Sequence, residues 1–226
     1  GPGSRPESDP HRRAWEFTQE HNPGWKQVWW TYQDADNFMA TMGEREHLAY
    51  RALVPMAAKA DLFRYCLLFK LGGVYLDSKS GASDLRKLFR ADDRMTISSW
   101  KHRRGSPLFM PYPFGEVQQW WLAAERGHPV FRAVIDRVVS GIETRLHENR
   151  LLKEPAWHSF LTRIYHSDVL KLTGPWAFTE AVLQNPRNLR VVTANGADVM
   201  RYDVLGNHPK WGAGYSAPGP MLQRVE

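Results

Sequence analysis

Four charged residues in the stretch 57–81, AAKADLFRYCLLFKLGGVYLDSKSG, have types and spacings that could do chemistry. Asp61 and Arg64 are three residues apart in a helical pattern, so they share one face of a helix. Asp77 ends the apolar run VYLD, and Lys79 follows two places later. A carboxylate there can accept ribose hydroxyls or hold a divalent cation, and a guanidinium can bind phosphate or carboxylate oxygens in a bidentate fork. Two plainer interpretations stay open: an Asp61–Arg64 ion pair on a solvated face, and an Asp77 that only caps the next turn.

The elements that must position these residues can be read around them. Pro55 permits a new helix, and Gly72 and Gly73 are expected to end it with positive φ angles. VYLD at 74–77 then predicts a short strand buried on both faces. Ligands of open α/β sheets bind beyond the carboxyl ends of the strands, which is where Asp77 would lie. The buried face of the helix is expected to consist of apolar residues three or four apart: Ala58, Leu62, Cys66 and Phe69.

Helices and short apolar strands alternate along the rest of the chain, which predicts α/β layers. The pattern at 118–124, QQWWLAA, is ambiguous between helix and strand, and the Trp120–Trp121 pair in it is more typical of a core than of a sugar platform. The other expected elements are helices at 10–21, 128–149, 155–166 and 174–184, a helix capped by Asp34 or Asp36 and running through Met42, strands at 26–32, 95–100, 189–193 and 199–204, and a turn or short helix at 83–89.

The composition limits the classes of function that this chain can have. The 226 residues carry a formal net charge of +6, which favours anionic partners such as phosphates and nucleotides. The basic residues are spread out, so the clustered pattern of a nucleic-acid binder is missing from the sequence. Cys66 is the single cysteine, which excludes an internal disulfide and a multi-cysteine zinc site. The sequence has no run of 18 apolar residues, so it predicts no membrane-spanning helix.

The run ADLFRYCLLFKLGGVYLD at 60–77 resembles the core signature of glycosyltransferase family 32, the DXD-containing sugar transferases. This family includes the fungal initiating mannosyltransferases and bacterial capsule enzymes. Weaker similarities lie at 22–30, 127–131, 173–182 and 207–216, so that the likeness spans about residues 12–216. The residues that match the central motif are Asp61, Arg64, Tyr65, Gly72, Gly73, Tyr75 and Asp77.

The resemblance implies a GT-A-like α/β fold, a Rossmann-related mixed sheet flanked by helices, as a single domain over 5–226. Residues 1–4, GPGS, look like a cloning scar. It also implies transfer of a sugar, with retention at the anomeric carbon, from a UDP- or GDP-sugar to a saccharide or glycoconjugate. By carry-over, the donor would be held by Asp61, Arg64, Tyr75, Asp77, Gly174, Pro175 and Trp211, and a metal such as Mn²⁺ by Asp77 and His208.

Two departures from the family pattern matter. Lys79 stands where the second acidic residue of the DXD motif is expected, and an ammonium cannot coordinate a cation. We therefore hypothesise that Lys79 is catalytic with Asp77 and neutralises the leaving diphosphate in place of part of the metal's work. The apolar strand with which the family usually begins also has no counterpart in this sequence.

Two alternatives stay open, the first because of these departures and the second because of the basic charge of the chain. One is a catalytically weakened or inactive relative that binds sugar or nucleotide, and the other is a basic nucleic-acid-binding module. The compartment follows from the source: the Golgi lumen for a eukaryotic protein, with a membrane anchor outside this chain, and the cytoplasm for a bacterial or viral one. The sequence does not name the donor sugar, the base or the acceptor.

Overall fold

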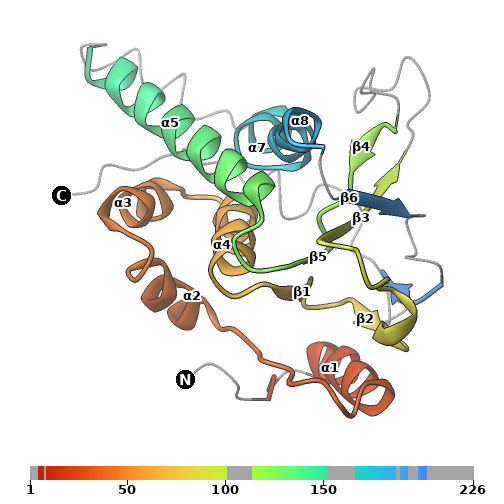
Figure 1. Cartoon of the computed structure of the whole chain (residues 1–226). Coiled ribbons are helices and arrows are strands. Elements are labelled where there is room, and N and C mark those ends of the chain that lie inside the picture. The colour runs from red at the N-terminus through yellow and green to blue at the C-terminus, as the bar shows by residue number, and fades with distance from the viewer. Residues whose placement is uncertain are drawn as a thin grey trace.

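The computed structural model of the chain describes residues 5–7, 9–100, 114–151, 166–186, 189–192 and 198–202. Within these ranges a mixed sheet packs against a layer of helices, which confirms the expected α/β class and is consistent with a GT-A-like arrangement (Figure 1). None of the described helices is long and apolar enough to cross a membrane. The expected helix at 155–166 lies almost wholly outside the described residues.

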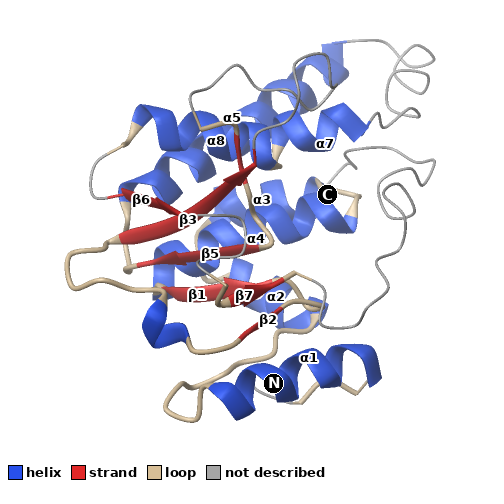
Figure 2. Cartoon of the chain, turned by 90° about the vertical axis from the view of Figure 1, so that its right-hand side faces the viewer, coloured by secondary structure: helices blue, strands red, loops and turns tan. Residues whose placement is uncertain are grey.

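Among the described residues, the main sheet has five strands. Figure 2 shows β6, β3, β5 and β1 following one another across the molecule. All pairs in it are antiparallel except β3 with β6, which is parallel. A second, two-stranded sheet pairs β2 with β7. The strands are β1 (Gly73–Leu76), β2 (Gly81–Ala82), β3 (Met95–Trp100), β4 (Glu116–Val117), β5 (Trp121–Ala124), β6 (Leu189–Val192) and β7 (Met200–Arg201).

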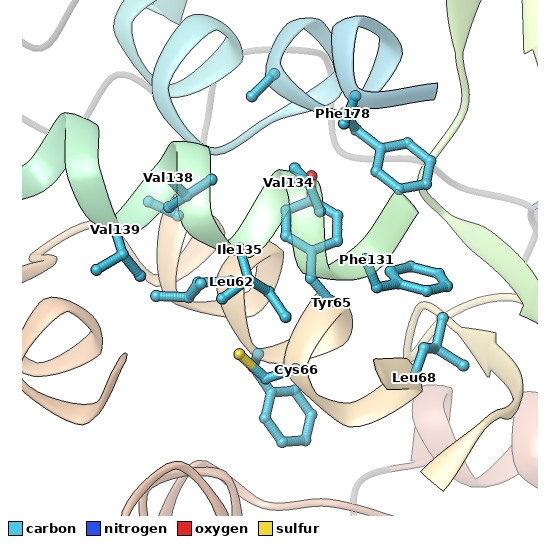
Figure 3. Close-up of a cluster of buried hydrophobic side chains, with 14 of the residues drawn as sticks. Leu62, Tyr65, Cys66, Leu68, Phe131, Val134, Ile135, Val138, Val139 and Phe178 are labelled. Carbon is cyan, nitrogen blue, oxygen red and sulfur yellow. The ribbon is translucent and has the colours of Figure 1, made fainter. Parts of the chain in front are cut away.

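The helices carry most of the apolar core. Figure 3 shows Tyr65 and Leu62 of α4 facing Val134 and Ile135 of α5. The Phe178 ring of α8 stacks on the Tyr65 ring, with ring centres 5.3 Å apart. Cys66 lies in this core, as expected. The helices are α1 (Asp9–His21), α2 (Tyr32–Met39), α3 (Glu44–Ala52), α4 (Met56–Leu71), α5 (Pro129–Leu151), α7 (His166–Leu172) and α8 (Pro175–Gln184), with a 3-10 turn, η1, at Leu85–Lys87.

A smaller core lies on the other face of the sheet. Trp120 and Trp121 are both buried in it, which confirms the core interpretation of this pair. Helix α1 is tied to this side by Asn22, whose Nδ2 donates to the Ala82 carbonyl at 3.0 Å, and by Thr18, whose Oγ1 accepts from the Ala82 N–H at 3.1 Å. The side of the sheet that carries β2 and η1 is therefore attached to the N-terminal helix by buried polar contacts.

A bulge separates β4 from β5. Both pair with the same strand: Ser99 of β3 opposes Val117, and Thr96 opposes Ala123. Two residues of β3, 97 and 98, therefore face five residues, 118–122. Bulges are frequent next to functional sites, where they re-aim a side chain or end the strand pairing. This one explains why 118–124 showed neither a helical nor a strand period.

One expected strand and one expected helix cap are wrong. The strand expected at 26–32 does not form: 26–31 are in no helix or strand, and Tyr32 begins α2. The N-cap is Thr31, not Asp34 or Asp36; its hydroxyl accepts from the Asp34 N–H, and the Asp34 carboxylate accepts back from the Thr31 N–H. This capping box stabilises the helix start at the position where an apolar run alone predicted an extended chain.

Strand β1 differs from its expectation in burial. The helix α4 and its termination are confirmed, with positive φ at Gly72 (68°) and Gly73 (102°). Yet β1 is only half-buried, because among the described strands it pairs with β5 alone and thus lies at the edge of the sheet. Its last residue precedes Asp77, which is partly exposed for the same reason.

Candidate functional site

The expected charged residues meet at the carboxyl end of β1. Arg64 lies between two carboxylates: its Nη2 is 3.2 Å from Asp61 Oδ1, and its Nη1 is 3.4 Å from Asp77 Oδ1. Asp61 and Arg64 are buried, so the pair is not the solvated surface pair that spacing alone allowed. The tertiary structure thus joins the helix residues to the strand-end carboxylate in one ionic cluster.

Arg64 also donates to two backbone carbonyls. Nη1 donates to the Gln119 carbonyl at 2.6 Å, and Nε donates to the Ala60 carbonyl at 3.2 Å. The guanidinium lies 4.8 Å from the centre of the Tyr75 ring. Burial disfavours the charged guanidinium, but the neighbouring Tyr75 and carboxylates raise the pKa of Arg64 above its ordinary value, so it stays charged. Arg64 therefore acts here as a fixed charge that orients Asp77.

Asp61 has a second anchor on the far side. The Thr173 hydroxyl donates to its Oδ2 at 3.0 Å. Burial raises the pKa of the Asp61 carboxyl to about 6, against the opposing effects of Arg64 and Thr173. The Tyr65 hydroxyl donates to the Thr173 carbonyl at 2.7 Å and accepts from the Gln119 side-chain amide. A buried polar network thus links α4, the bulge and the start of α8.

The bulge supplies two backbone acceptors that sequence reasoning missed. The Gln119 carbonyl binds Arg64, and the Trp120 carbonyl accepts the Asp77 N–H at 2.8 Å. Backbone carbonyls have no side-chain signature, so no motif marks them. The two consecutive glutamines in an otherwise apolar segment were the only local signal, since buried amides need partners.

Asp77 is the member of the cluster that reaches solvent. Its side chain is 27% exposed, and Tyr75 donates to its Oδ1 at 3.0 Å. The Asp77 carbonyl accepts the Ser80 N–H at 2.8 Å, so Asp77 also begins a turn, as its plainer interpretation predicted. This turn carries Lys79, whose Nζ lies 5.7 Å from the centre of the Tyr202 ring.

The structure describes some of the other expected donor residues. Gly174 is the N-cap of α8 and Pro175 is its first residue, and the preceding Thr173 brings this turn against Asp61. Trp211 and His208 lie outside the described residues. The ligand-binding roles of all these residues remain predictions.

The described residues do not by themselves fit a Mn²⁺ site. Nowhere in the described ranges are three His, Cys, Asp or Glu side chains grouped as such a site needs. Asp77 Oδ1 already contacts the cation Arg64, and the next residue but one is the cation Lys79.

The geometry agrees with what comparison with known proteins shows. Residues 8–81 match the family model described as "Glycosyltransferase sugar-binding region containing DXD motif". Residues 8–81 are thus similar to a glycosyltransferase sugar-binding region. This region includes Asp61, Arg64 and Asp77, the three members of the ionic cluster.

Two fungal proteins are similar over more of the chain. An initiation-specific alpha-1,6-mannosyltransferase of Candida albicans is 28% identical over 184 residues, which cover 72% of this chain and 41% of that protein. A protein of the same name from Schizosaccharomyces pombe is 27% identical over 141 residues, covering 58% and 33%. The chain therefore matches less than half of either relative. A solved structure named PaToxG Glycosyltransferase shares 20% identity at a TM-score of 0.36, covering 57% of this chain and 36% of that chain.

Proposed function

We propose that this chain binds a nucleotide-sugar donor and transfers its sugar, with retention at the anomeric carbon, to a saccharide or glycoconjugate acceptor. The observation that carries the proposal is the cluster at the end of β1, in which buried Arg64 and Asp61 hold a partly exposed Asp77. Together with the matching sugar-binding region, this supports a donor site at the carboxyl end of the strand.

Asp77 is the residue that we assign to the donor. Both of its side-chain contacts, to Arg64 and Tyr75, use Oδ1, which leaves Oδ2 for a ribose or sugar hydroxyl. Burial raises the pKa of the Tyr75 phenol, so Tyr75 stays protonated and keeps donating to the carboxylate. The carboxylate is thereby held in one orientation before the donor arrives, which reduces the entropic cost of binding.

Lys79 is assigned to the leaving group. In the transfer, the bond between the anomeric carbon and the diphosphate oxygen breaks, and a bond to the acceptor oxygen forms on the same face of the sugar. The acceptor proton passes to the departing diphosphate. An ammonium beside that diphosphate neutralises the charge that develops as the bond breaks, which stabilises the transition state.

The proposal is tested by donor turnover. GDP-mannose and UDP-glucose are the first probes, since the similar fungal proteins are named mannosyltransferases. We expect the purified chain to hydrolyse or transfer one of them, and Asp77→Ala to lower kcat/KM by roughly a hundredfold or more. Asp84→Ala is a matched control, because Asp84 is 26% exposed and also pairs with an arginine, Arg86. Equal turnover by Asp77→Ala and the wild type would contradict the proposed transferase activity at this site.

A weakened relative that only binds the donor is the second candidate, and the presence of Lys79 in the motif favours it. Calorimetry separates the two. Nucleotide-sugar binding that Asp77→Ala abolishes, without turnover in the wild type, would support the binding protein.

A further inference from the structure

A cavity of about 240 Å³ opens at the end of the sheet away from Asp77. Gly73, the first residue of β1, lines it, whereas Asp77 follows the last residue of that strand. A strand of this length spans about 13 Å. The end of β5 and the start of β3 complete the wall, with Ala124 and Met95. The cavity is thus separate from the cluster of Arg64.

One wall of the cavity is an ordered aromatic surface. Trp25 stacks on Phe89 with ring centres 5.8 Å apart and planes at 27°, and it remains 40% exposed. The backbone N–H of Trp25 donates to the Asn22 backbone carbonyl at 3.0 Å. Asn22 is buried and accepts from the Leu85 N–H at 2.8 Å. Because the loop and its ring are anchored on both sides, the indole presents a fixed surface without a ligand.

The charges around the cavity cancel in pairs. Asp93 Oδ2 is 2.6 Å from Arg190 Nε, and Glu125 Oε1 is 3.2 Å from Arg94 Nη1. Asp93 is also bonded to the Arg90 N–H at 2.8 Å, so it is committed to the turn. The site therefore offers neither a net positive charge for a phosphate nor a net negative charge for a cation.

The exposed rim still offers polar groups. The Glu125 and Arg94 side chains are both largely exposed, so they can exchange part of their mutual contact for hydroxyl groups of a ligand. A sugar ring matches this arrangement because one face is made of C–H groups and its edge of hydroxyls. The volume lies below the range usual for drug-sized ligands, about 300–1,000 Å³, which suits one ring of a longer chain.

We infer that this cavity is a second carbohydrate site, which stacks one neutral sugar residue of an oligosaccharide on Trp25 and binds its hydroxyls with Glu125 and Arg94. The site goes beyond the proposed transfer, since it needs no donor. It would hold a saccharide on the enzyme at a place that donor chemistry does not occupy. An apolar peptide side chain and an anionic saccharide are the competing occupants.

The test is a titration of the whole chain with α-mannotriose, maltotriose and cellotriose, followed by the indole signals in ¹H–¹⁵N spectra. We expect a neutral trisaccharide to bind with a Kd on the order of 1 mM and to shift the Trp25 signal. Trp25→Ala should weaken binding roughly tenfold. Tyr32→Ala should leave it unchanged, since Tyr32 is an aromatic residue that is 67% exposed at the start of α2. Glu125→Gln, at an exposed position that does not threaten folding, should weaken it roughly threefold.

Other results would overturn the inference. These are no binding of any neutral trisaccharide, equal Kd values for Trp25→Ala and the wild type, or tighter binding of tri-galacturonate or of an apolar dipeptide at the same indole. Asp77→Ala should bind the trisaccharide normally, while Trp25→Ala should bind the nucleotide-sugar normally. These crossed measurements separate a failure of this inference from a failure of the proposed function.

Discussion

Arg64 Nη1 donates to the carbonyl oxygen of Gln119 at 2.6 Å, across 55 residues of sequence. The contact joins the middle of α4 to the bulge between β4 and β5. Because Arg64 also contacts Asp77, the bulge fixes the position of the strand-end carboxylate through the guanidinium. The bulge and the ionic cluster therefore form one unit.

Replacing the Arg64 guanidinium should destabilise the fold. We expect Arg64→Lys to lower the free energy of unfolding by about 3 kcal/mol, because a lysine ammonium cannot bond Gln119, Ala60 and Asp61 together in the buried site. Chemical denaturation measures it. Arg45→Lys is the control, since Arg45 pairs with Glu143 at an exposed place and should lose less than about 1 kcal/mol. Equal losses in the two variants would show that the buried network does not hold Arg64 as described.

Asp61 predicts a pH dependence with a definite sign. Its carboxyl has a pKa of about 6 in the folded protein, against an ordinary value of 3.8 that the unfolded chain is expected to keep, because burial disfavours its charge. Between these values the folded state holds more protons than the unfolded chain, so its contribution makes stability fall as pH rises. The difference in unfolding free energy between the wild type and Asp61→Asn should fall by about 2 kcal/mol from pH 4 to pH 7. Urea unfolding at constant ionic strength checks this, and a difference that is flat with pH contradicts it.

Because the Lys79 ammonium is proposed to take over part of the metal's role, donor binding should be insensitive to metal removal. We expect calorimetric binding of the nucleotide-sugar to change by less than about twofold with EDTA, and Lys79→Ala to weaken it roughly tenfold. Lys79→Asp restores an acidic residue at that position and should make binding depend on Mn²⁺. Wild-type binding that disappears in EDTA would instead assign the charge neutralisation to a metal.

The turn before α8 leaves no room for a side chain at Gly174. A Cβ at Gly174 would lie 2.9 Å from Leu170 Cα and 3.0 Å from the Val169 carbonyl oxygen, which are backbone atoms that cannot move aside. Gly174→Ala should lower the free energy of unfolding by about 2 kcal/mol and reduce donor turnover by shifting Thr173 away from Asp61. Gly24→Ala is the control, since its Cβ would meet nothing within 4 Å. Melting temperatures of the two variants decide the point, and equal values would refute the crowding.

The sequence by itself determined the local part of this protein. Helix α4, its end at Gly72 and Gly73, strand β1 and the place of Asp77 follow from apolar spacing and from glycine's access to positive φ, which act over a few residues. The failure at 26–32 was also local, because a capping box outweighed an apolar run. The family motif supplied the charged residues, but not their contacts.

Only the tertiary structure decided how the site is assembled. The partners of Arg64 and Asp61 include Gln119 and Thr173, which lie 55 and 112 residues away in the sequence. Backbone carbonyls aimed by a bulge and a hydroxyl at a helix start carry no spacing that a sequence pattern can show. The same holds for the cavity beside Trp25, whose walls come from segments that only the folded sheet brings together.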